Sequence, residues 1–107
     1  MATIVLVEDD VDVARLLAAV LAEAGHEVRL AADGLAALEV VRAAAPDLVL
    51  VDVSLPGSLD GLEVTRLLRA DVLAPGVPVL AVTARSGAAD RRRGEEVGVT
   101  DYVVKPS

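Results

Sequence analysis

Asp47-Leu48-Val49-Leu50-Val51-Asp52 is the stretch that decides how this chain folds. A run of branched apolar residues without polar alternation is typical of a strand whose two faces are both covered by helices. In open α/β sheets, ligands bind in the crevice outside the carboxyl ends of such strands. Asp52 stands at that end, and a turn follows it directly. We therefore predict that Asp52 is a functional residue.

On either side of this stretch, apolar segments alternate with segments of helical periodicity. The expected strands are Thr3–Val7, Glu27–Ala31, Leu48–Val51, Val77–Val82 and Thr100–Val104. The expected helices begin at Asp10 or Asp12, at Asp33 and at Asp60-Gly61, and a fourth could span Asp90–Glu96. Strands that alternate with helices predict parallel βαβ units in a doubly wound sheet. At 107 residues, the chain is expected to form one domain, residues 1–107.

The composition excludes several classes of function. A formal net charge of −7 argues against binding of nucleic acid or anionic membranes by this chain alone. The absence of cysteine excludes disulfides and thiolate metal sites. Met1–Thr3 leads straight into a strand, without a signal-like segment, and no apolar run is long enough to span a membrane. We therefore expect a cytoplasmic domain.

Four of the five expected strands end in polar residues: Glu8-Asp9, Asp52, Thr83 and Lys105. The ends of parallel strands meet at one edge of the sheet, so these residues should converge. Three carboxylates repel one another, and an all-oxygen cluster suits Mg²⁺. A carboxylate between a metal ion and a lysine is poised to receive a phosphoryl group, because cations neutralise the charge on the transferring oxygens. Thr83 would add a hydroxyl donor.

With these residues in place, the sequence resembles the receiver domains of two-component response regulators, including the single-domain chemotaxis regulator. The resemblance rests on Val7–Asp10, Val51-Asp52 with Leu55-Pro56 and Asp60-Gly61, Thr83-Ala84, and Asp101-Tyr102 with Lys105-Pro106. It covers essentially the whole chain. Each motif alone is weak, but the set is highly specific. It implies a flavodoxin-like, three-layer α/β/α fold with a five-stranded parallel sheet in the order 2-1-3-4-5.

The resemblance also implies a role for each residue of the site. Asp52 would be the phosphoacceptor, and the domain would assist its own phosphorylation and dephosphorylation without acting on an external substrate. Mg²⁺ would be held by Asp52 together with Glu8, Asp9 and the backbone carbonyl of Ser54. The remaining roles are pairing with the phosphoryl group (Lys105), switching (Thr83 and Tyr102) and tuning of hydrolysis (Ser54 and Arg85).

The implied partners are a sensor histidine kinase or a histidine phosphotransfer protein upstream and an effector domain or protein downstream. The resemblance implies no direct contact of this domain with nucleic acid or a membrane. The oligomeric state is open, with a homodimer among the options.

Some of these residues have an alternative structural interpretation, and the site has alternative functional ones. Asp10 is expected mainly to start a helix, with a metal role as the alternative. His26 is expected to be a bystander, and Arg91–Arg93 a solvated face or a partner surface. An enzyme of the haloacid dehalogenase type would need a second aspartate two residues after the nucleophile, where this chain has Ser54. A receiver-like module that works without phosphorylation is the other alternative.

The chain departs from the family pattern in two places. Gly94 and the scarcity of apolar residues predict a short or poorly ordered fourth helix. The family normally has a fifth helix after the Lys-Pro pair, whereas this sequence stops at Ser107 without it. The alternatives are a truncation, which we favour, a swapped or partner-supplied element, and a natural minimal domain. Apolar residues of the first and fifth strands would then lack cover on one face.

Overall fold

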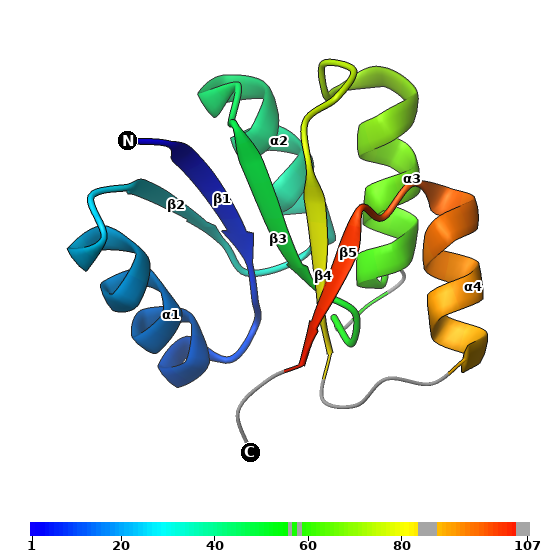
Figure 1. Cartoon of the computed structure of the whole chain (residues 1–107), viewed down its shortest axis with the longest axis horizontal. Coiled ribbons are helices and arrows are strands. Elements are labelled where there is room, and N and C mark those ends of the chain that lie inside the picture. The colour runs from blue at the N-terminus through cyan, green and yellow to red at the C-terminus, as the bar shows by residue number, and fades with distance from the viewer. Residues whose placement is uncertain (56, 58, 84–87, 105–107) are drawn as a thin grey trace.

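A computed structural model describes residues 1–55, 57, 59–83 and 88–104, and within them the side chains of residues 88–91 are excluded. The described residues form five strands and four helices that alternate along the chain (Figure 1). The strands are β1 (Thr3–Val7), β2 (Glu27–Ala31), β3 (Leu48–Asp52), β4 (Val79–Thr83) and β5 (Asp101–Val104). The helices are α1 (Val11–Glu23), α2 (Gly34–Ala44), α3 (Gly61–Asp71) and α4 (Ala88–Val97).

All the strand pairs are parallel, and the sheet order is β2-β1-β3-β4-β5. This confirms the doubly wound sheet and the predicted strand order. β1 and β3 lie side by side with Val7 opposite Val51, and β4 continues the sheet with Val82 opposite Asp52. The carboxyl ends of β1, β3 and β4 therefore meet at one edge, as parallel strands require.

Alternate residues of β1 and β3 enter two separate apolar cores. Val5, Val49 and Val79 pack with residues of α2 and α3 on one face of the sheet. On the other face, the core contains residues of β1, β3, β4 and α1, namely Ile4, Leu6, Leu50, Val82 and Ala14. Because both faces of β1 and β3 are covered, these strands are apolar at nearly every position. Helix α4 lies beside α3 (Figure 1).

The expected lack of cover differs between the first and fifth strands. Val103 and Val104 of β5 are exposed, as expected. The expectation was wrong for β1, where Ile4 and Leu6 are almost completely buried. The reason is that β1 lies inside the sheet, where α1 covers this face.

Aspartates cap three helices at the predicted positions. The Asp10 carboxylate accepts hydrogen bonds from the Asp12 and Val13 N–H groups, and Asp33 and Asp60 cap α2 and α3 in the same way. Such caps satisfy backbone donors that have no partner inside the helix. The predicted helix starts are confirmed, and Asp10 has its expected role.

The weakly patterned segment forms the ten-residue helix α4, the shortest of the helices in the described part of the chain. β4 starts two residues later than predicted, at Val79, and includes Thr83, which pairs with Val104 of β5. The periodicity of Val77–Val82 could not predict this register. None of the described helices is long and apolar enough to cross a membrane.

His26, which is expected to take no part in the functional site, forms a hydrogen bond at the start of β1. Its Nδ1 atom accepts a hydrogen bond of 3.0 Å from the Ala2 N–H. At the next residue of the chain, the Thr3 N–H donates a 2.8 Å hydrogen bond to the Asp47 carboxylate. These two side chains hold the start of β1 from opposite sides, since His26 precedes β2 and Asp47 precedes β3.

Candidate functional site

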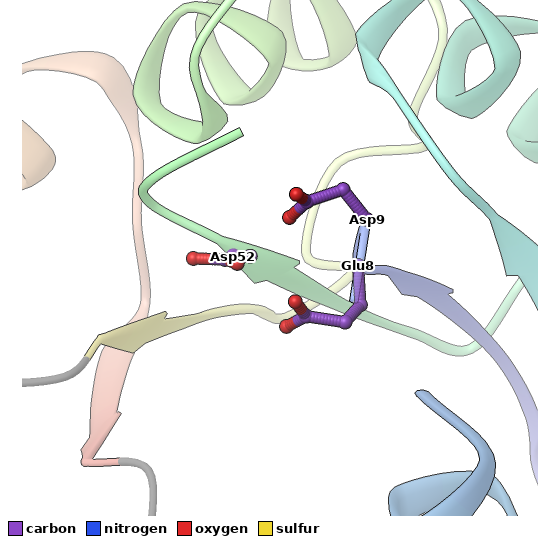
Figure 2. A group of neighbouring side chains, drawn as sticks. All are labelled: Glu8, Asp9 and Asp52. Atoms are coloured by element: carbon purple, nitrogen blue, oxygen red, sulfur yellow. The ribbon is translucent and has the colours of Figure 1, made fainter. Parts of the chain in front are cut away.

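Three carboxylates meet where β1 and β3 end. Glu8 and Asp9 directly follow β1, and Asp52 is the last residue of β3 (Figure 2). Each offers one carboxylate oxygen, and these three atoms lie within 4.8 Å of one another. The predicted convergence of these residues is therefore present. Such a set of oxygen atoms is suited to a hard divalent cation.

The carboxylates differ in their exposure to solvent. Glu8 and Asp52 retain only 4% and 3% of their accessible surface, whereas Asp9 is exposed. Burial and mutual repulsion both disfavour several negative charges in one place. A bound cation would offset both costs, and the exposed Asp9 leaves one side of the cluster open to solvent.

Asp52 is held in place by its own loop. The Ser54 N–H donates a 2.8 Å hydrogen bond to Asp52 Oδ1. The Val53 N–H donates to the Val82 carbonyl, and the Gly61 N–H donates to the Val53 carbonyl, at 3.0 and 3.2 Å. These bonds tie the end of β3 to β4 and to the start of α3, so the Asp52 carboxylate has a fixed position.

Gly61 allows α3 to approach the end of β3 closely. A β-carbon at residue 61 would overlap the backbone oxygen of Asp52 and would lie 2.7 Å from its carbonyl carbon. The Asp60-Gly61 pair was predicted only as a helix start. The need for glycine beside Asp52 is visible only in the structure, because the contact joins residues nine apart in the sequence.

Asp10 and Ser54 flank the cluster. The Asp10 N–H donates a 3.2 Å hydrogen bond to Glu8 Oε1, while its carboxylate caps α1. Asp10 is not part of the three-carboxylate group found among the described residues. Ser54 is exposed and contacts Asp52 through its backbone N–H. The metal role predicted for its carbonyl stays a prediction.

Thr83 lies on β4, which pairs with β3, and Tyr102 lies on β5, the edge strand that pairs with β4. Thr83 is buried at the end of β4, one residue beyond the position that pairs with Asp52. Tyr102 lies on β5 opposite Ala81 and is half-buried against Leu62, Ala81 and Val99. Their switching roles stay predictions. Lys105 and Arg85 lie outside the described residues, and so do their predicted roles.

Two ion pairs occupy the first turn of α3. Asp60 accepts a 2.8 Å hydrogen bond from the Glu63 N–H, and its second oxygen lies 3.1 Å from an Arg93 nitrogen of α4. Sequence reasoning treated Arg93 only as part of a charged surface. The Arg66 guanidinium hydrogen-bonds to Glu63 and thereby holds the pKa of that carboxyl below its usual value.

A hollow of about 310 Å³ lies between α1 and β2, next to the cluster. Glu8 and Asp9 form one side of it, and Arg15 and Leu30 contribute to its lining. The cluster is therefore bordered by open space on the side of α1.

Known proteins resemble this chain in sequence. The sequence matches the family model for the response regulator receiver domain over residues 4–107. It is 43% identical over 103 residues to the DNA-binding response regulator MtrA of Mycobacterium tuberculosis, covering 96% of this chain and 43% of that protein. It is 40% identical over 107 residues to the response regulator PleD of Caulobacter vibrioides, covering 99% of this chain and 23% of PleD. The chain thus spans less than half the length of these relatives.

Solved structures show the same likeness. The chemotaxis protein CheY4 of Vibrio cholerae superimposes with a TM-score of 0.94 at 31% identity, covering 100% of this chain and 88% of that one. The BeF3-activated receiver domain of RstA from Klebsiella pneumoniae superimposes with a TM-score of 0.87 at 35% identity, covering 98% and 86%.

Proposed function

This chain belongs to the response regulator receiver domain family of two-component signalling, and from that premise we propose that Asp52 is its phosphoacceptor. The observation that supports this assignment most directly is the position of Asp52. It ends the central strand, it is buried, and it shares one site with Glu8 and Asp9. A carboxylate held in this way can act as a nucleophile whose approach to a donor is set by the fold.

In the proposed reaction, a carboxylate oxygen of Asp52 attacks the phosphorus of a phosphohistidine on the donor protein. The new P–O bond forms as the P–N bond breaks, and the protonated imidazole leaves as neutral imidazole. The product is an acyl phosphate on Asp52. Negative charge accumulates on three phosphoryl oxygens in the transition state, so the site needs cations and hydrogen-bond donors around Asp52.

Mg²⁺ is the cofactor that fits this site best. Carboxylate oxygens from Glu8, Asp9 and Asp52, together with the Ser54 backbone carbonyl, are the ligands that we propose for it. A small divalent cation favours oxygen ligands and keeps coordination positions for phosphoryl oxygens. When bound, it would neutralise charge on the phosphoryl group.

The other predicted residues complete the proposal. Lys105 pairs with the phosphoryl group, and the Thr83 hydroxyl donates a hydrogen bond to one of its oxygens. Movement of Thr83 favours a different position of the Tyr102 ring, which passes the signal on. Arg85 and Ser54 flank the path of the attacking water, so they set how long the acyl phosphate survives.

The proposed partners follow from the same chemistry. A sensor histidine kinase or a histidine phosphotransfer protein supplies the phosphoryl group, and an effector domain or protein receives the signal. The net charge of −7 supports a domain that does not itself bind DNA, although MtrA is a DNA-binding regulator. We propose a cytoplasmic location, where histidine kinases present their phosphoryl groups.

Intact mass spectrometry after incubation with acetyl phosphate and Mg²⁺ tests this proposal. We expect a gain of one phosphoryl group in the wild type. We expect no gain in Asp52→Asn or in a sample without Mg²⁺. Asp71→Asn serves as the matched control because Asp71 is an exposed carboxylate at the end of α3, and it should be modified like the wild type. Equal modification of a folded Asp52→Asn variant would refute the assignment.

A further inference from the structure

The tip of the only tyrosine ring in the chain lies against the backbone of α4. Tyr102 packs against Leu62, Ala81 and Val99, and its phenol group reaches Gly94. A β-carbon at residue 94 would overlap Tyr102 Oη and would lie 2.7 Å from Cζ. The ring thus occupies space that a side chain at residue 94 would otherwise fill.

α4 is held firmly at this point by the turn that ends it. The N–H groups of Gly98 and Val99 both donate hydrogen bonds to the Gly94 carbonyl, at 3.0 and 2.8 Å. The Gly98 carbonyl in turn accepts a 3.0 Å hydrogen bond from Arg69 Nε of α3. Any shift of Gly94 away from Tyr102 would disturb these bonds.

The neighbouring residue anchors the other side of α4. Arg93 pairs with Asp60, and Asp60 also caps α3 through the Glu63 N–H. The next residue, Gly61, lies against the Asp52 backbone. α4 is therefore braced against the helix that starts beside the acceptor, whereas the Tyr102 ring can move by rotation about its own side-chain bonds.

We infer that Gly94 is a positioning residue for Tyr102, and that the absence of a side chain at residue 94 permits the half-buried position of the ring. Glycine is a poor helix former, so helix propensity alone favours alanine at this position. A methyl group there would meet the end of a rotatable side chain on one side and a braced backbone on the other. The ring would give way, and residue 94 therefore sets the fraction of molecules in which Tyr102 is half-buried.

A functional consequence rests on the proposed phosphoacceptor role. Tyr102 and Thr83 belong to the paired strands β5 and β4, with Ala81 opposite Tyr102 and Thr83 opposite Val104. A ligand shifts a two-state equilibrium away from the populations that the two states have before it binds. If phosphorylation of Asp52 moves the ring, residue 94 determines how large that movement is.

Tyrosine fluorescence reports on this ring alone, because the chain has one Tyr and no Trp. We would measure quenching by acrylamide, a neutral molecule, in the wild type, in Gly94→Ala and in Glu95→Ala. Glu95 is the matched control, being an exposed residue of the same helix. In Gly94→Ala the quenching constant should rise by roughly twofold or more, because most Tyr102 rings would leave the half-buried position. In Glu95→Ala it should stay at the wild-type value. Wild-type quenching in a folded Gly94→Ala protein would overturn the inference.

Thermal unfolding covers the case in which Gly94→Ala does not fold. With the ring removed by Tyr102→Ala, an added Gly94→Ala change should raise Tm, because helix propensity then acts without the clash. If the added change lowers Tm or prevents folding in that background too, α4 itself rejects the side chain and the inference is wrong.

The mass assay with acetyl phosphate separates this inference from the proposed function. Gly94→Ala should still gain one phosphoryl group, but its quenching should change less upon phosphorylation than that of the wild type. A wild type that gains no phosphoryl group refutes the proposed function and leaves the quenching comparison valid. An unaltered quenching constant in Gly94→Ala refutes only the inference.

Discussion

At the scale of single residues, exposure separates the three carboxylates of the site. Glu8 and Asp52 are buried and belong to the packing of the sheet edge, while Asp9 is exposed. Asp9 is consequently the carboxylate that can be neutralised with the least disturbance of the fold. At Gly61, by contrast, a substitution should disturb the fold, because its surroundings leave no room for a side chain.

Asp9→Asn should weaken Mg²⁺ binding and leave the stability without Mg²⁺ nearly unchanged. We expect the affinity to fall by roughly tenfold or more, because loss of even an outer partner of a metal site often costs that much. Isothermal titration with MgCl₂ measures it. Asp12→Asn, an exposed carboxylate in the first turn of α1, should bind Mg²⁺ like the wild type. Equal affinities of all three proteins would contradict the proposed ligand set.

Gly61→Ala should destabilise the domain although alanine is the better helix former by about 1 kcal/mol. The methyl group would overlap the Asp52 carbonyl, and a backbone atom in a paired strand cannot rotate away. Overpacking of this kind costs about 1–3 kcal/mol. Urea unfolding measures the change. A gain in stability would show that α3 moves away from β3 without cost.

At the scale of the elements, the first turn of α3 is the best-defined junction. Its cap, Asp60, is shared between the Glu63 N–H and the Arg93 guanidinium, so one carboxylate serves both α3 and α4. Glu63 stands three residues after the cap, but its carboxylate bonds to Arg66 one turn later. The junction therefore depends on charged groups at the protein surface.

The Glu63–Arg66 pair should make a pH-dependent contribution to stability. In the folded protein the pKa of Glu63 is lowered from its usual 4.5, and the largest cause of this shift is the hydrogen bond from Arg66. A carboxyl with a lowered pKa in the folded state contributes its stability above the unfolded pKa, and the contribution is lost as the pH falls through the folded pKa. Arg66→Ala should therefore be less stable than the wild type at pH 7 and should approach it below pH 4.5.

Urea unfolding at both pH values measures that difference, and the effect should be small because the pair is largely exposed. NMR titration of the Glu63 carboxyl carbon provides a direct readout, in which Arg66→Ala should shift the midpoint upward. A difference in stability that is the same at pH 7 and well below pH 4.5 would assign the effect of Arg66 to packing instead of charge.

At the scale of the whole molecule, the site exists only when the sheet has formed. Glu8 and Asp52 are separated by more than forty residues in the sequence and meet because β1 pairs with β3. An unfolded chain offers no such group of oxygen atoms. A cation that binds the cluster therefore binds the folded state and stabilises it.

Mg²⁺ should accordingly raise Tm in a concentration-dependent way. At a concentration about 100 times Kd the gain would be about 2.7 kcal/mol, and each kcal/mol raises the Tm of a domain of this size by about 4–8 °C. Differential scanning calorimetry with MgCl₂, against NaCl of equal ionic strength, separates binding from screening. The gain should be smaller in Asp9→Asn. An equal rise in NaCl would mean that screening of the acidic chain explains the effect.

Much of the architecture and of the site could be predicted from local patterns. The apolar runs marked β1 and β3, and the aspartates before α1, α2 and α3 marked the helix starts, because burial and capping act within a few residues. The order of residues at the strand ends was enough to predict that Glu8, Asp9 and Asp52 converge, since parallel strands share one functional edge. The strand order itself came from the family resemblance.

The sequence by itself therefore determined the sheet, the helices and the candidate cluster, whereas the tertiary structure decided the contacts that join the elements. Four such contacts follow no local pattern in the sequence. They are the contact of Tyr102 with Gly94, the approach of Gly61 to Asp52, the Arg93–Asp60 ion pair and the His26–Ala2 hydrogen bond. Each depends on the distance and rotation at which separate elements pack. Those quantities arise from the close fit of many side chains at once, and no short stretch of sequence encodes them.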